Sequence, residues 1–71
     1  MTTTWIITGR SAKYGGKCIK CQRWVDPARY WEAILVQVKG GSGHGVGHAG
    51  CLGGDIGGVQ KHWRGPDEIT I

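Results

Sequence analysis

Two pairs of candidate metal ligands, each with two residues between its members, constrain the fold of this 71-residue chain more than any other feature. Cys18 and Cys21 form the first pair, and His48 and Cys51 form the second, so the whole pattern is C-x2-C-x26-H-x2-C. A two-residue spacing lets one tight turn present both side chains to an ion, and zinc prefers four such ligands in a tetrahedron. The pattern therefore predicts a Zn²⁺ site that joins two distant turns.

Other interpretations of these side chains are weaker. His44 competes with His48 for the metal, but the spacing to Cys51 favours His48, and His62 is expected to be a surface histidine. Buried free thiols would need a core that a glycine-rich segment does not offer. A thioredoxin-like redox pair would need a βαβ context, which this sequence lacks.

The composition explains why a metal is needed. Small domains bury little apolar surface and usually require a disulfide, a metal or a partner. The chain has fourteen Gly and no Phe, so four Trp and two Tyr must supply much of the core. An odd number of Cys and the absence of a secretory signal or a long apolar run argue for the cytoplasm. We expect one zinc-binding domain over residues 1–71, with a core from 3 to 52 and a C-terminal extension from 53 to 71.

Local patterns predict mainly strands. Residues 3–8 are rich in β-branched and aromatic side chains and should form a strand that ends at Gly9. Residues 30–39 show both helical and strand spacing, but their β-branched residues favour a strand after a turn at Asp26-Pro27. Residues 68–71 alternate and should form a closing edge strand.

The segment from residue 40 to residue 58 holds most of the glycines, so we expect a bound ion to organise it. Residues 55–63 are the candidate for a short helix, although Gly57 and Gly58 disfavour it. The predicted fold class is a small α+β, zinc-stabilised domain, with a short antiparallel sheet and a short helix, similar to a zinc finger.

The surroundings of the ligands resemble the poly(ADP-ribose) polymerase-type zinc finger. The resemblance rests on Ser-Ala-Lys-Tyr-Gly-Gly-Lys-Cys-Ile-Lys-Cys at residues 11–21 and on His-Ala-Gly-Cys at residues 48–51, and it covers roughly residues 5 to 52. Small zinc proteins of actinobacteria and their phages are similar in outline. The resemblance implies the same four ligands, a small antiparallel sheet with a short helix, and recognition of DNA ends and breaks.

Charge gives the first hypothesis for function, which is nucleic-acid binding and most specifically DNA binding. Nine Lys and Arg against five Asp and Glu give a net charge of +4. Basic side chains bind phosphates, and an exposed aromatic ring can stack on an unpaired base. The predicted nucleic-acid-binding residues surround the first ligand pair and are Arg10, Lys13, Lys17, Lys20 and Arg23.

The second hypothesis is a protein-interaction module, such as a phage or accessory protein that docks on a host factor. Four Trp exceed what a thin core needs, and Trp63-Arg64 is a candidate anchor. No catalytic set stands out, so we do not expect an enzyme, and the sequence identifies no small-molecule substrate. We expect no membrane contact, because the longest strongly apolar run is far too short to span a membrane. A zinc with three protein ligands is the remaining enzymatic interpretation.

Residues 45–50 fit the dinucleotide-binding motif G-x-G-x-x-G, but the chain has no room for the crossover helix and second strand that the dinucleotide-binding fold needs.

Overall fold

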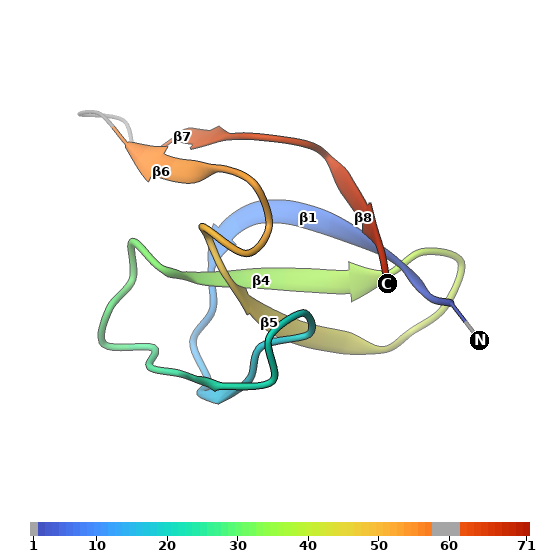
Figure 1. The fold of residues 1–71 in the computed structure, drawn as a ribbon, viewed down its shortest axis with the longest axis horizontal. Coiled ribbons are helices and arrows are strands. Elements are labelled where there is room, and N and C mark those ends of the chain that lie inside the picture. The colour runs from blue at the N-terminus through green and yellow to red at the C-terminus, as the bar shows by residue number, and fades with distance from the viewer. Residues whose placement is uncertain (1, 58–61) are drawn as a thin grey trace.

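The computed structural model describes residues 2–57 and 62–71, which are built from short strands and turns (Figure 1). The strands are β1 (Thr4–Ser11), β2 (Gly16–Lys17), β3 (Trp24–Val25), β4 (Ala33–Val38), β5 (His44–His48), β6 (Asp55–Gly57), β7 (His62–Arg64) and β8 (Glu68–Thr70).

A four-stranded antiparallel sheet with the order β5-β4-β1-β8 forms the centre of the molecule (Figure 1). In its register Leu35 lies opposite Val46, and Ile7 lies opposite Val36. Two smaller antiparallel pairs, β2 with β3 and β6 with β7, complete the strands. The strand predicted within residues 30–39 is confirmed as β4, and the edge strand predicted at residues 68–71 is confirmed as β8.

Each face of the sheet carries its own small core, because successive side chains of β4 point to opposite faces. Ile34 and Val36 pack with Ile7 and Leu52 on one face, against which Trp63 is also packed. On the other face Ala33 packs with buried residues of the β2–β3 region and of β5, which are Ala12, Cys18, Val25 and Val46. Cys18, the first predicted ligand, is thus part of the second core.

The predicted α+β class is wrong, because the described residues form a small all-β fold without a helix. The candidate helix at residues 55–63 is replaced at its two ends by β6 and β7, which pair from Asp55 to Arg64. The middle of that stretch, residues 58–61, lies outside the described residues. Pairing between the two ends outweighs a helix that Gly57 already disfavours.

The strand predicted at residues 3–8 is confirmed as β1, but it continues past Gly9 to Ser11. The register of β1 against β4 shifts between Ile7 and Ser11, and Gly9 has a φ of 75°. A glycine in the left-handed region is typical of a β-bulge, which lets the strand bend without ending.

Among residues 2–57 and 62–71, no helix has the length and apolar character needed to cross a membrane.

Candidate metal centre

Four side chains from two distant turns converge beside the β2–β3 pair. The Sγ atoms of Cys18, Cys21 and Cys51 and a ring nitrogen of His48 all lie within 4.8 Å of one another. All three cysteines are free thiols, so no disulfide competes for the sulfur atoms. This Cys₃His group could hold a metal ion, and it consists of the four residues predicted as ligands.

The first turn presents Cys18 and Cys21. The Gln22 N–H donates to the Cys18 carbonyl oxygen at 2.9 Å, and Gln22 itself has a φ of 64°, so the chain reverses directly after the second cysteine. The Ile19 N–H donates to the Val46 carbonyl oxygen at 3.0 Å, which fixes this turn to β5. The first ligand pair is therefore anchored by main-chain bonds to the strand that leads to the second pair.

The second turn starts at His48, where β5 ends, and carries Cys51 one turn later. The Leu52 N–H donates to the His48 carbonyl oxygen at 3.0 Å, and the Leu52 side chain is 1 % exposed. A Cβ added at Gly47 would lie 3.1 Å from both Leu52 methyl groups. Glycine at this position therefore lets Leu52 pack against β5, which holds the turn closed around the ligands.

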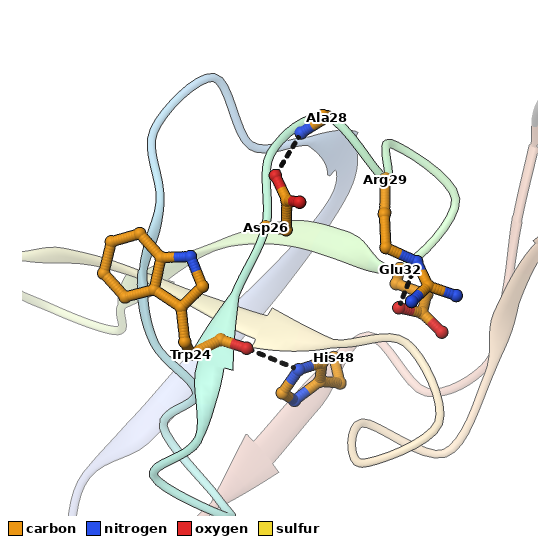
Figure 2. Close-up of polar contacts among 6 residues, drawn as sticks. All are labelled: Trp24, Asp26, Ala28, Arg29, Glu32 and His48. Atoms are coloured by element: carbon orange, nitrogen blue, oxygen red, sulfur yellow. Dashed lines mark hydrogen bonds and ion pairs between the residues drawn. The ribbon is translucent and has the colours of Figure 1, made fainter.

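The imidazole of His48 has contacts at both ring nitrogens, and Figure 2 shows the contact with the Trp24 carbonyl oxygen. Its Nδ1 lies 3.3 Å from Cys21 Sγ and 4.0 Å from Cys51 Sγ, whereas its Nε2 lies 3.2 Å from the Trp24 carbonyl oxygen. With Nε2–H donating to that carbonyl, Nδ1 keeps its lone pair for a metal, as is usual for ligating histidines. Tetrahedral zinc with bonds of about 2.0–2.3 Å places its ligand atoms roughly 3.5–3.8 Å apart, so these distances bracket the required spacing.

Main-chain groups make the site favourable for a thiolate at Cys18. The Lys20 N–H and the His48 N–H donate to Cys18 Sγ at 3.4 Å and 3.5 Å. Burial raises the pKa of this thiol, but hydrogen bonds from the main-chain N–H groups of Cys21, His48 and Lys20 outweigh burial and lower the pKa to about 6. Cys18 is therefore prepared to be the first anionic ligand.

The pKa of the Cys51 thiol is shifted in the opposite direction from that of Cys18. Burial, a hydrogen bond with Cys21 and the negative charge of Cys18 raise the pKa of Cys51 to about 11. Several thiolates at this spacing repel one another unless a cation lies between them. A divalent ion among the four ligand atoms would remove that repulsion, which is the chemistry expected of a metal site.

The remaining histidines, His44 and His62, lie outside the Cys₃His group. His44 begins β5, and its Nε2 lies 3.3 Å from Gln37 Nε2, so it does not take part in the Cys₃His group. Four residue-to-residue steps along the extended strand place its main chain roughly 13 Å from that of His48. His62 is exposed in β7 and is likewise not part of the group.

The five basic residues predicted to bind nucleic acid surround the first ligand pair and are exposed, as are Tyr14 and Trp24 between them. Among the described residues, ion pairs join Arg29 to Glu32 and Lys39 to Glu68, and neither involves any of the five. The five exposed side chains are Arg10, Lys13, Lys17, Lys20 and Arg23.

Two features of the site could not be predicted from the sequence. The Trp24 carbonyl oxygen belongs to the main chain, so no residue type marks it as the partner of His48. The left-handed conformation of Gln22 is also unmarked, because Gly or Asn would be the usual signal for it.

Comparison with family models, with curated proteins and with solved structures found no match for the chain. The resemblance to the poly(ADP-ribose) polymerase-type zinc finger therefore stays a prediction.

Proposed function

We propose that the chain is a small zinc module in which Cys18, Cys21, His48 and Cys51 hold one structural Zn²⁺ and the basic surface beside it binds DNA. The observation that carries the metal part is the convergence of four ligand atoms within 4.8 Å, together with the Nε2–H bond of His48 to the Trp24 carbonyl oxygen. Three thiolates and one imidazole are a soft donor set that suits zinc.

A structural role follows from the number of ligands. Four protein ligands complete a tetrahedron and leave no position for a reactive water, which is the arrangement of structural zinc sites. The ion would connect the turn at Cys18 to the turn at Cys51 in a chain whose two cores are small. Because the unfolded chain has no preformed site, the binding energy would stabilise the fold directly.

Two histidines of one strand provide a matched test of the metal site. His48→Gln should abolish stoichiometric zinc binding or weaken it severely, whereas His44→Gln should retain one zinc per chain, measured by elemental analysis after dialysis. Loss of zinc from both variants, or from neither, would contradict the assignment of His48.

The distribution of charge supports nucleic-acid binding. Residues 10–25 contain five Lys or Arg and no Asp or Glu, whereas the rest of the chain has four basic and five acidic residues. The net charge of +4 therefore originates in the segment that also carries the first ligand pair. Tyr14 and Trp24 are 78 % and 67 % exposed within this segment, so rings that can stack on bases lie among cations that can contact phosphates.

The binding test uses zinc-loaded protein with labelled DNA in fluorescence anisotropy at increasing salt. We expect micromolar or tighter binding at low salt, with the logarithm of affinity falling by about 0.7–0.9 per phosphate contact for each unit of log salt. Lys20→Glu should weaken binding, whereas Arg64→Glu in β7 makes the same charge change outside the basic segment and should have little effect. Absence of a complex at low salt would reject the proposed DNA binding while leaving the metal site intact.

Protein interaction is the second candidate function, and one cluster favours it. Tyr30 and Trp31 are 45 % and 46 % exposed, with ring centroids 5.2 Å apart, and Arg29 lies 5.5 Å from the Trp31 ring. Aromatic and arginine side chains are enriched at interface hot spots. Trp63, by contrast, is packed against a core and donates through Nε1 to the Pro66 carbonyl oxygen at 3.0 Å. Capture of a partner protein that resists nuclease treatment and is lost in Trp31→Ala would support this second function.

A further inference from the structure

A hollow of about 310 Å³ opens between the β2 region and the β4–β5 side of the sheet. Its floor is formed by Leu35 and Val46, which lie opposite each other in the register of β4 and β5. Tyr14, Lys17 and the glycines between them line the hollow from the side of β2, and His44 lines it from β5. The hollow therefore lies on the same face of the sheet as the second core.

Glycine keeps this hollow open on the side of β2. A Cβ added at Gly16 would lie 3.2 Å from a methyl group of Val46, on the floor of the hollow. A Cβ at Gly15 would collide with the Trp24 ring, which covers the main chain next to Tyr14. The strand main chain thus approaches both the floor and an aromatic ring more closely than another residue type would allow.

The lining has a specific chemical character. Its described residues include one permanent cation, Lys17, the imidazole of His44, and no carboxylate. Most of the remaining lining is apolar side chain or glycine, and Tyr14 is 78 % exposed at the rim. An apolar floor, a free aromatic ring and an adjacent cation fit a flat heterocycle that carries a phosphate.

We propose that this hollow binds one unpaired nucleotide of a single DNA strand, with its base against Tyr14 and its phosphate at Lys17. The proposal rests on the DNA binding proposed above and restricts it to unpaired DNA. A base in a duplex cannot enter the hollow, because both of its faces are stacked.

The test compares zinc-loaded protein with a thymidine strand of about 12 nucleotides, the matching ribo-strand and a duplex of the same length. Tyr14→Ala should weaken binding of the DNA strand about tenfold and leave duplex affinity nearly unchanged, because stacking is lost and phosphate contacts remain. Tyr14→Phe should retain the affinity. Tyr30→Ala removes an exposed tyrosine outside the hollow and is the matched control.

Amide chemical shifts of the zinc-loaded wild-type protein locate the strand without any substitution. On addition of the DNA strand, the largest shifts should fall on residues 14–17 and 44–46. Shifts concentrated on β7 and β8, or equal loss of affinity in Tyr14→Ala and Tyr30→Ala, would overturn the proposal, as would tighter binding of the ribo-strand. If Lys20→Glu weakens DNA binding but Tyr14→Ala does not, the hollow is excluded while the basic surface stands. If no nucleic acid binds at all, both proposals fail.

Discussion

Gly50 and Gly53 lie on either side of Cys51 in the second predicted ligand turn and differ mainly in main-chain conformation, which makes them a sensitive test of how this turn is held. A Cβ added at Gly50 meets nothing within 4 Å, and the main chain there has no positive φ. A Cβ at Gly53 meets only Pro66, at an ordinary 3.7 Å, but Gly53 has a φ of 81°. Replacing each by alanine therefore separates main-chain conformation from crowding.

The expected difference in folding stability between the two variants follows from two opposing effects of alanine. Alanine restricts the unfolded chain and stabilises a protein by about 0.4–1 kcal/mol where the native conformation accepts it. The left-handed conformation costs an alanine about 1–2 kcal/mol. Gly50→Ala should thus stabilise slightly, Gly53→Ala should be neutral to destabilising, and the two should differ by about 1–2 kcal/mol. For a domain of this size that corresponds to about 5–15 °C in melting temperature.

The measurement is thermal unfolding of both variants by circular dichroism, loaded with one equivalent of zinc at the same concentration of free metal. Metal concentration must be matched, because a ligand of the folded state raises the melting temperature by mass action. Both variants should still bind one zinc per chain, since neither substitution touches a ligand atom.

Equal melting temperatures for the two variants would refute the reasoning. That result would mean that the turn around Cys51 adjusts its main chain freely, so that the φ of Gly53 is not imposed by the fold. A Gly53→Ala variant more stable than Gly50→Ala would contradict it more directly.

Three further predictions concern the metal and the core. Removal of zinc by a chelator should abolish the cooperative unfolding transition, seen by circular dichroism, and a persistent transition would show that the two small cores suffice. Leu52→Ala should lower the free energy of unfolding by about 2–5 kcal/mol in urea titrations, because Leu52 is 1 % exposed, and a loss below about 1 kcal/mol would show that the turn relaxes around it. Zinc affinity should rise with pH between about 6 and 8, by at least tenfold per unit, because bound thiolates must lose their protons and the pKa of Cys51 is raised to about 11 while that of Cys18 is lowered to about 6. A competition titration with a chromogenic chelator measures this slope, and an affinity independent of pH would contradict it.

The convergence of the four ligands could be predicted because each pair depends on one local turn. The two residues between Cys18 and Cys21, and again between His48 and Cys51, limit how far apart the members of a pair can lie. The only long-range requirement is that the two turns meet, and in the structure β5 meets it, because this strand ends at His48 and is bonded to the first turn at Val46.

The expected helix was wrong for a reason that a local pattern does not contain. Asp55 and Ile56 become strand residues because they pair with Arg64 and Trp63. Gly54 permits this pairing, since a Cβ there would collide with the Arg64 carbonyl group. Close main-chain approach between segments ten residues apart is a tertiary effect, which local helix propensity does not report.

The extension of β1 beyond Gly9 is also a tertiary effect that the local sequence pattern does not report. Glycine after a run rich in β-branched and aromatic residues is a common end of a strand, so the sequence predicts that the strand ends at Gly9. In the structure a Cβ at Gly9 would lie 2.8 Å from the Cβ of Trp63, so the glycine makes room for β7 while the strand continues to Ser11.

The bond between His48 and the Trp24 carbonyl oxygen has a consequence for how such a protein can diversify. Every residue type has the same peptide carbonyl, so position 24 can exchange its side chain without changing the group that orients the imidazole. The indole itself is 67 % exposed. Substitution can therefore alter the exposed surface at this position while the main-chain bond that orients His48 is kept.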